Sequence, residues 1–558
     1  MNERFRVALL LAVAMLVYAN TLHNRFTFDD GMYVFRNPAV TNFSIRGLFE
    51  PTIATNIFRP VTFVTFALNW AVGGDQPFGY HVVNLLLHAG VILLLYLVLR
   101  GLLEPAPRAA TVALAVAWLF AVHPIHTEAV ASIVGRSELL AAGFLLAAWL
   151  LHLHDRPFLA LLCFALALLS KESAAAFLPL VLAGDYACGK LKPSPRYGWI
   201  AGVTLLYMAL LWKVQGGRFG AEDVSFLDNP LASLPAGWRI LNALRVAWKY
   251  VGLHVYPATL SCDYSYSAFL LYANWRHTLP AAVATAFVLA LWIWALWTQR
   301  RDWVLAGAIY LGGFAVTANI LVPTGAIMAE RFAYLPSAGF CLFIVLIWMR
   351  LENHNRRMAW SLFAILLAAL SLRTIVRNRD WHDNLTLFSA AVRAVPGSAK
   401  MHANLGGEYV KRGQLDAART EFQSALRIYP AFPEAEEAYG LLESRLGQDQ
   451  EARRLLEAAL SQTANDSSDY DFRALNLATQ LMKLGQNADA LKLLNQEIAT
   501  CPRCPLAWSN RAAVRYARGE LASARADAQT ALRLDPLNVQ AQNLLKSLDA
   551  SAPFAPQR

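Results

Sequence analysis

Two adjacent aspartates, Asp29 and Asp30, follow the first apolar stretch of the chain and are the first candidates for chemistry. A carboxylate beside a bound hydroxyl can orient that hydroxyl and accept its proton, which is general base catalysis. Because a solvated aspartate is a weak base near neutral pH, one of the pair would need burial or a charged partner. The alternative interpretation is a solvated Asp-Asp-Gly turn without a catalytic role. We predict that Asp29 and Asp30 are the catalytic residues.

Basic residues that could bind a phosphate lie near the ends of several apolar stretches. The forked guanidinium of an arginine can bind two oxygens of one phosphate, and Arg331 is well placed for such a contact at the level of the lipid headgroups. The alternative role for such residues is to anchor the chain at the membrane interface. The candidate phosphate-binding residues are Arg331, Arg136, Lys171 and Arg59.

A second group of polar residues combines histidines with carboxylates. His123 and His126 follow the third apolar stretch, but their spacing is not that of the H-E-x-x-H zinc motif. A divalent cation held by both histidines and an acidic residue is one interpretation, and a hydrogen-bonded cluster without a metal is the one that we favour. We therefore predict no cofactor. The supporting polar cluster is His123, His126, Glu128, Glu172 and Glu330.

The elements that carry these residues are predicted to be membrane helices. Hydrophobic residues make up 56% of the 558-residue chain and charged residues only 16%, and most of the apolar excess precedes residue 376. Runs of apolar residues of this kind predict about eleven membrane-spanning helices. The predicted spans are 5–19, 79–99, 109–122, 137–153, 158–169, 173–187, 199–212, 280–297, 303–321, 337–349 and 358–376.

Basic residues also predict the orientation of these spans. With a cytoplasmic N-terminus, the inner loops hold the basic clusters around Arg100, Arg156, Lys190, Arg300 and Arg356, as the positive-inside rule requires. An odd number of spans then places the C-terminal part outside, in the periplasm or in the lumen of the endoplasmic reticulum. These anchors explain most of the formal net charge of +10, so we predict no nucleic-acid partner.

A repeat defines the last 160 residues. The small residues Ala418, Ala452, Ala490 and Ala524 recur at separations of 34, 38 and 34 positions, which is the period of tetratricopeptide repeats. Stacked helix pairs of this kind form a groove that holds polypeptide, and most such arrays are plain protein-binding scaffolds.

The predicted domains follow from these patterns. An all-α membrane domain covers 1–378, with a long outer loop at 20–78 that contains the aspartates. A linker or partial repeat helix follows at 379–398, then the repeat domain at 399–548 and a disordered tail at 549–558. Within the repeats, Cys501 and Cys504 form an isolated C-x-x-C, for which a local disulfide is one interpretation; a zinc site would need a second ligand pair.

Four segments carry a resemblance to a known family. They are LFAVHPIHTEAV (119–130) with Gly135-Arg136, Ser170-Lys171-Glu172, AERFAYLPS (329–337) and NRDW (378–381). With the repeats, they resemble the transmembrane and tetratricopeptide-repeat O-mannosyltransferases. The resemblance implies a GT-C-type membrane domain that transfers a sugar from a polyprenyl-phosphate donor, dolichyl-phosphate mannose in the eukaryotic members, to protein hydroxyls. It also implies that the aspartates of the first outer loop are catalytic, and that motif corresponds to Asp29 and Asp30.

We therefore predict a membrane glycosyltransferase that moves mannose or a similar sugar from a polyprenyl phosphate to Ser or Thr of an acceptor polypeptide, with inversion at the anomeric carbon. Two alternatives are a membrane-anchored scaffold without catalysis and a transporter of lipid-linked sugars. Eleven spans exceed what an anchor needs, and a transport path is expected to place polar groups near the middle of the bilayer rather than at one surface.

Overall fold

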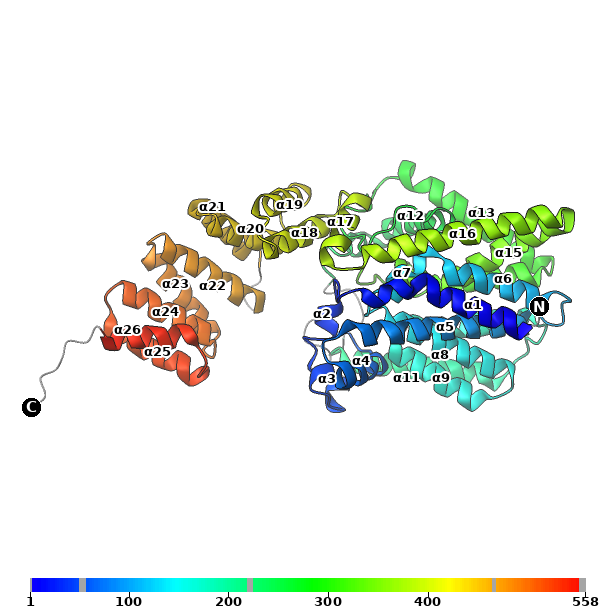
Figure 1. Ribbon diagram of the computed structural model, residues 1–558, viewed down its shortest axis with the longest axis horizontal. Coiled ribbons are helices and arrows are strands. Elements are labelled where there is room, and N and C mark those ends of the chain that lie inside the picture. Colours follow the sequence, from blue (N-terminus) through cyan, green and yellow to red (C-terminus); the bar gives the residue numbers. More distant parts are fainter. Residues whose placement is uncertain (1–2, 50–56, 218–223, 464–467, 551–558) are drawn as a thin grey trace, which may run out of the picture. The chain divides into compact units, whose positions relative to one another are not determined.

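The computed structural model describes residues 3–49, 57–217, 224–463 and 468–550, and this part of the chain is built of helices without a β-strand (Figure 1). The chain divides into two compact units, Met1–Ser398 and Ala399–Arg558. The predicted all-α class with tetratricopeptide repeats is confirmed. Residues 551–558 of the predicted disordered tail lie outside the described part.

Six described helices of the first unit are long and apolar enough to cross a membrane. They are α1 (Glu3–Tyr18) with its continuation η1 (Ala19–His23), α5 (Pro77–Leu103), α8 (Arg136–Leu153), α11 (Pro195–Val214), α13 (Trp275–Trp297) and α16 (Arg356–Asp380). A seventh span results if α6 (Ala109–Val122) and the segment Pro124–Ala131, which are bent by 56° relative to each other, cross the membrane together.

The expectation of about eleven spans is met only in part. The other five predicted spans fall on helices α6, α9 (Pro157–Ser170), α10 (Phe177–Ala187), α14 (Arg301–Phe314) and α15 (Pro336–His354). The first four of these have only 11 to 14 residues. At about 1.5 Å per residue, 14 residues cover about 21 Å, which is less than the roughly 30 Å of a hydrocarbon core.

The segment 20–78, which the sequence predicts as a long outer loop, contains helices instead. They are α2 (Asp30–Tyr33), α3 (Pro38–Thr41), η2 (Arg46–Phe49) and α4 (Pro60–Gly73). Helix α4 is apolar and packs against α9. It begins with Pro60, whose fixed backbone angle suits the first turn of a helix, and this places Arg59 at the N-cap.

Short helical turns between the long helices present the polar residues of the site. These turns are η3 (Pro124–His126) and α7 (Thr127–Ala131) after α6, η4 (Glu172–Ala176) after α9, and η7 (Glu330–Ala333) before α15. Gly135 closes the turn from α7 to α8, where a Cβ atom would lie 2.3 Å from the carbonyl oxygen of Ala129. On α15, a Cβ at Gly339 would lie 2.5 Å from the carbonyl oxygen of Ala306, so only glycine permits this close crossing of α14 and α15.

Three further helices complete the described part of the first unit, the first being the short η6 (Pro230–Ser233). Helix α12 (Ala236–Val255) is followed by a long connection to α13, and α17 (Asn384–Ala394) follows α16 after a short turn. Asp383 caps α17 through a capping box with Thr386, in which each side chain bonds the backbone of the other residue.

The second unit is a stack of helix pairs. Its helices are α18 (Ala399–Lys411), α19 (Leu415–Ile428), α20 (Pro433–Arg445), α21 (Asp449–Ser461), α22 (Ser468–Lys483), α23 (Asn487–Thr500), α24 (Pro505–Ala517), α25 (Leu521–Leu534) and α26 (Val539–Ala550). The four alanines that defined the repeat are all fully buried. Each first helix is joined to its partner by a turn with a glycine at positive φ, namely Gly413, Gly447, Gly485 and Gly519.

Candidate functional site

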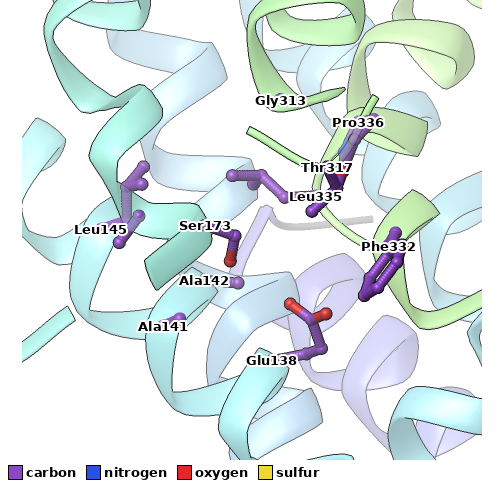
Figure 2. Close-up of a pocket in the computed structure, with 11 residues that line it drawn as sticks. Glu138, Ala141, Ala142, Leu145, Ser173, Gly313, Thr317, Phe332, Leu335 and Pro336 are labelled. Atoms are coloured by element: carbon purple, nitrogen blue, oxygen red, sulfur yellow. The ribbon is translucent and has the colours of Figure 1, made fainter. Parts of the chain in front are cut away.

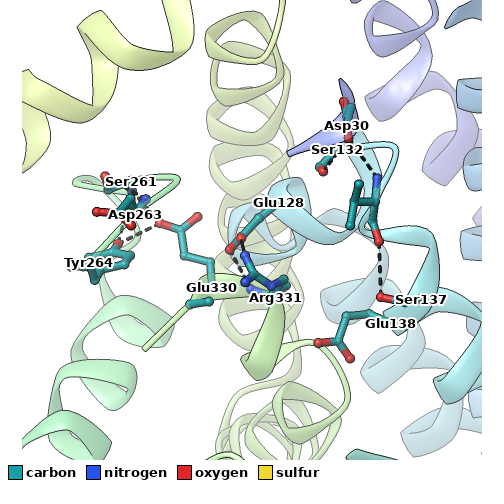
Figure 3. A network of polar contacts seen from close by, with 12 residues as sticks. Asp30, Glu128, Ser132, Ser137, Glu138, Ser261, Asp263, Tyr264, Glu330 and Arg331 are labelled. Carbon is teal, nitrogen blue, oxygen red and sulfur yellow. Dashed lines mark hydrogen bonds and ion pairs between the residues drawn. The ribbon is translucent and has the colours of Figure 1, made fainter. Parts of the chain in front are cut away.

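The two aspartates occupy different environments. Asp30 is fully buried, and its carboxylate accepts hydrogen bonds from the backbone N–H groups of Thr27 (2.9 Å, to Oδ2) and Val134 (3.0 Å, to Oδ1) and from the hydroxyl of Ser132 (3.3 Å). Figure 3 shows how this carboxylate joins the loop that leads to Ser137 and Glu138. Burial raises the pKa of Asp30 to about 7, against the opposing effect of the hydrogen bonds from Thr27 and Val134.

Asp29 is only half-buried, and it is the aspartate that a substrate can reach. It precedes α2, where its backbone carbonyl accepts a hydrogen bond from the N–H of Met32 (3.0 Å). The side chain of a general base must touch the hydroxyl that it deprotonates, and this geometric requirement comes before the match of pKa values. The arrangement therefore favours Asp29 over the enclosed Asp30 as a base.

Arg331 is held by Glu128, and the charge of Asp29 also acts on it. Its backbone N–H donates to the Glu128 carboxylate (2.8 Å), and its guanidinium Nη1 forms an ion pair with the same group (Figure 3). Burial alone would lower the pKa of Arg331, but the carboxylates of Glu128 and Asp29 outweigh it and raise that pKa. The Arg331 side chain is 29% exposed and that of Glu128 only 3%, so the arginine is the accessible member of the pair.

Two more cations adjoin Arg331, and each has a carboxylate partner. Arg59 forms a two-bond ion pair with Glu172, with Nε–Oε2 and Nη2–Oε1 distances of 3.2 and 2.7 Å. Lys171 does not pair with its neighbour Glu172 but with Glu138, and both members of that pair are buried. Burial would raise the pKa of Glu172, but Arg59 and Lys171 lower it to about 2. The positive charges of Arg59 and Arg331 both act on Lys171, so the three cations form one cluster.

A small apolar pocket, with a cavity volume of about 20 Å³, adjoins this cluster. Figure 2 shows the Glu138 carboxylate at the pocket, opposite the ring of Phe332. The Phe332 ring also makes cation–π contacts with two of the cations, since Lys171 Nζ lies 5.0 Å and Arg331 Cζ 5.3 Å from its centre. The remaining wall comes from α8, η4, α14 and the start of α15 and is mainly apolar: Ala141, Ala142, Leu145, Ser173, Ala174, Gly313, Thr317, Leu335 and Pro336.

The two histidines are buried among aromatic rings. His123 Nδ1 accepts a hydrogen bond from the N–H of Ile125 (3.2 Å), and its Nε2 lies 3.1 Å from the carbonyl oxygen of His254. His126 Nε2 lies 2.7 Å from the hydroxyl of Ser337, and its ring packs against Phe120. Among the described residues, no group of three or more His, Cys, Asp or Glu side chains could hold a metal ion. The histidines thus join η3 to α12 and α15.

Arg136 bonds to residues outside the cation cluster. It is fully buried, and its guanidinium donates to Asn84 Oδ1 (2.9 Å), Asn69 Oδ1 (2.6 Å) and the carbonyl oxygen of Tyr80 (2.9 Å). It also lies 4.7 Å from the centre of the Phe66 ring. These partners belong to α4 and α5, so Arg136 joins these helices to the start of α8.

Glu330 joins the site to the connection between α12 and α13. Its Oε1 accepts hydrogen bonds from the N–H of Ser261 (2.6 Å) and the hydroxyl of Tyr264 (2.7 Å), while Oε2 lies 3.7 Å from Nη2 of the buried Arg377. Burial raises the pKa of Glu330 to about 7, although the charge of Arg377 opposes this shift. Tyr264 and Arg377 were not predicted from the sequence; the only signal was the position of Arg377 directly before the NRDW segment.

In chemical terms, the described site combines three features. A half-buried carboxylate, Asp29, can accept a proton. A cluster of three cations, whose exposed member is Arg331, can stabilise negative charge on a phosphate. An apolar pocket adjoins the cations. Of the residues predicted from the sequence, the structure brings together Asp29, Arg331, Arg59, Lys171, Glu128 and Glu172, whereas Asp30, Arg136, His123, His126 and Glu330 hold the surrounding segments.

A tetratricopeptide repeat family model matches residues 376–431, 403–469 and 475–539. The first match begins within α16, so it includes α17, which belongs to the first compact unit.

Curated proteins match a larger part of the chain. Protein O-mannosyl-transferase F38B6.6 of Caenorhabditis elegans is 31% identical over 76% of this chain and 63% of its own length. Protein O-mannosyl-transferase TMTC3 of Mus musculus is 27% identical over 76% of this chain and 51% of its own length. Protein O-mannosyl-transferase TMTC4 of Mus musculus is 29% identical, with 73% of this chain and 64% of the relative covered. The chain thus spans about half to two thirds of the length of these relatives.

Proposed function

We propose that this chain, a homologue of the transmembrane and tetratricopeptide-repeat protein O-mannosyltransferases, is a membrane glycosyltransferase. It transfers mannose or a similar sugar from a polyprenyl phosphate to Ser or Thr hydroxyls of a polypeptide. Its membrane domain is of the GT-C type, and its site faces the periplasm or the lumen of the endoplasmic reticulum. The positive-inside distribution of basic residues supports this orientation.

The observation that carries the proposal is the contact between the apolar pocket and the cation cluster. A polyprenyl phosphate has an apolar chain attached directly to an anion, so its site must place an apolar wall beside a cation. Glu138 lines the pocket and pairs with Lys171, and Phe332 lines it beneath Lys171 and Arg331. The donor chain accordingly lies against the apolar residues that line this small pocket, while its phosphate meets the exposed part of Arg331.

The proposed reaction is a direct displacement. Asp29 accepts the proton of the acceptor hydroxyl, and the oxygen forms a bond to the anomeric carbon of the sugar. The bond between that carbon and the phosphate oxygen breaks, and its electron pair leaves with the polyprenyl phosphate. Arg331 and Lys171 stabilise the negative charge that develops on the phosphate. Because the hydroxyl attacks opposite the leaving group, the anomeric configuration is inverted.

The second unit supplies the acceptor site in this proposal. Tetratricopeptide repeats stack into an extended surface that binds polypeptide segments, and the family model covers most of this unit. The membrane unit alone would then keep the donor site but lack the surface that holds the acceptor. Bound membrane lipid and a lipid-linked donor are the other partners that we propose.

The test is a transfer assay with the purified full-length protein in lipid nanodiscs. Synthetic polyprenyl-phosphate mannose serves as donor, an unfolded Ser/Thr-rich polypeptide serves as acceptor, and intact-mass spectrometry detects a hexose added to the acceptor. Asp29→Asn is the test variant, and Asp75→Asn is the matched control because Asp75 is exposed. We expect transfer by the parent and the control and a loss of roughly a hundredfold or more for Asp29→Asn.

The alternatives predict other results in the same assay. A scaffold without catalysis would not bind the donor saturably, and a transporter would move the lipid-linked sugar across the bilayer without forming glycosylated polypeptide. Equal transfer by the parent and Asp29→Asn would refute the assignment of the base. Transfer from a nucleotide sugar but not from the lipid-linked sugar would refute the proposed donor.

A further inference from the structure

The residue before the proposed base has an unusual backbone conformation. Phe28 has a φ angle of +50°, in the left-handed region that bulky side chains rarely adopt because Cβ then crowds the backbone carbonyl oxygen. Such a conformation persists only where the surrounding contacts hold it in place, and it is most often found next to functional residues. Contacts from other segments are therefore expected to hold the loop around Phe28.

The contacts that hold Phe28 come from the start of α17. The backbone N–H of Phe28 donates a hydrogen bond to Oδ1 of Asn384 (2.8 Å), the first residue of that helix. One helical turn later, Phe388 meets the Phe28 ring edge-on, with 5.9 Å between ring centres and an angle of 80° between the planes. The backbone N–H of Arg25 bonds the carbonyl oxygen of His382 (2.8 Å), which holds the beginning of the same loop.

Asp29 thus lies in the chain between two residues that are each held by a distant segment. Phe28 is bound to α17, and Asp30 is bound to the segment 132–134 through Ser132 and Val134. These anchors lie more than 100 residues away from the loop in either case. A carboxylate between two such fixed points loses little freedom when a substrate binds, which is the condition for efficient proton transfer at a defined atom.

We propose that Asn384 is a positioning residue for the reaction: its side-chain carbonyl holds the Phe28 backbone in the left-handed region and thereby aims Asp29 at the acceptor hydroxyl. This inference rests on the proposed function, in which Asp29 is the base. Helix α17 lies within the residues that the tetratricopeptide repeat model matches, but it belongs to the first compact unit. The proposal therefore gives this helix a role in catalysis through a contact inside the first unit.

The decisive comparison is between Asn384→Ala and Asn384→Asp. Alanine removes the acceptor of the Phe28 N–H, whereas an aspartate oxygen can still accept that bond. Helix α17 keeps its capping box from Asp383 in both variants, so the helix itself is retained. Arg393→Ala, at an exposed position of the same helix, is the matched control.

Two measurements report on these variants in the full-length protein. The first is the transfer assay, from which kcat and the KM for the donor are obtained. We expect Asn384→Ala to lower kcat about tenfold with little change in the KM for the donor, and Asn384→Asp to stay within about twofold of the parent. The second is hydrogen–deuterium exchange of the peptide containing residues 25–31, which should speed up in Asn384→Ala but not in Asn384→Asp.

A third variant tests the conformation itself. Glycine adopts positive φ without strain, so Phe28→Gly in the Asn384→Ala background should recover part of the lost kcat. An alanine variant with unchanged kcat, or equal losses for the alanine and aspartate variants, would overturn the inference. A lower yield of folded protein with a parental kcat per folded molecule would overturn it as well, because Asn384 would then serve stability alone.

The test separates this inference from the proposed function. Asp29→Asn is assayed in parallel, and full activity of that variant would refute Asp29 as the base whatever Asn384 does. Loss of activity in Asp29→Asn together with full activity in Asn384→Ala would leave the proposed function in place and refute the role of Asn384.

Discussion

Replacing the two adjacent aspartates one at a time with asparagine should affect different properties: stability in one case and activity in the other. Asp30→Asn should destabilise the protein, whereas Asp29→Asn should leave its stability unchanged and abolish most of its transfer activity. The difference follows from burial: Asp30 is fully enclosed, and Asp29 is only half-buried at the start of α2.

The loss of stability expected for Asp30→Asn follows from the hydrogen bonds of Asp30. Each carboxylate oxygen accepts one backbone N–H, from Thr27 at Oδ2 and from Val134 at Oδ1. An asparagine side chain has one oxygen, so its amide nitrogen must face one of these two donors and leaves it unsatisfied. A buried donor without a partner costs about 1–3 kcal/mol of stability. For Asp29, loss of a positioned base lowers the rate about a hundredfold, which corresponds to about 2.7 kcal/mol of activation free energy.

Thermal unfolding of each variant in detergent, followed by the transfer rate per folded molecule, checks both halves of this prediction. Asp75→Asn serves as the control for an exposed carboxylate. If Asp30→Asn unfolds at the temperature of the parent, the hydrogen-bonded role of Asp30 is wrong. If Asp30→Asn loses activity per folded molecule and Asp29→Asn does not, the two roles are exchanged.

Four further predictions follow from the site. Arg331→Lys keeps a charge beside Glu128 but loses two-oxygen contact, so the KM for the lipid-linked donor should rise about tenfold or more; an unchanged KM in steady-state assays would make Arg331 a mere anchor. Arg136→Ala removes the donor to the oxygens of Asn84, Asn69 and Tyr80 and should lower the free energy of unfolding by about 3 kcal/mol or more in thermal or chemical denaturation, while the folded fraction stays active. Burial raises the pKa of Glu330 to about 7, which is above the pKa of a glutamate in the unfolded chain. The contribution of Glu330 to stability is therefore complete at low pH and is lost as the pH rises through 7. Relative to Glu330→Gln, the parent should unfold at a progressively lower temperature between about pH 5 and about pH 8. Removal of residues 399–558 should abolish transfer to polypeptide but keep saturable donor binding, and loss of donor binding in a folded truncation would contradict the assignment of the donor site to the first unit.

The spans show where prediction from the sequence succeeds and where it fails. All eleven predicted apolar stretches contain helix, because apolar runs in a membrane must satisfy their own backbone hydrogen bonds. Only six of these helices are long and apolar enough to cross alone, since composition does not reveal where a helix stops. The helix α4 was missed because a 14-residue apolar segment between polar stretches resembles part of a loop.

The candidate site shows the same division. Residue types and motif positions selected Asp29, Arg331, Lys171 and Arg59 as candidates for chemistry. Their partners could not be predicted, because ion pairs form between segments that are distant in the chain. Lys171 pairs with Glu138 rather than with the adjacent Glu172, which pairs with Arg59 from 113 residues away.

The sequence by itself determined the all-α class, the period of the repeats and the family resemblance, because each depends on local periodicity or on short motifs. Only the tertiary structure decided which of two identical neighbouring residues is enclosed. Asp30 is buried because Ser132 and Val134 meet it from 102 and 104 residues away, whereas Asp29 remains half-buried and its charge acts on Arg331. Burial depends on the packing of distant segments, and neither aspartate carries that information in its own stretch of sequence.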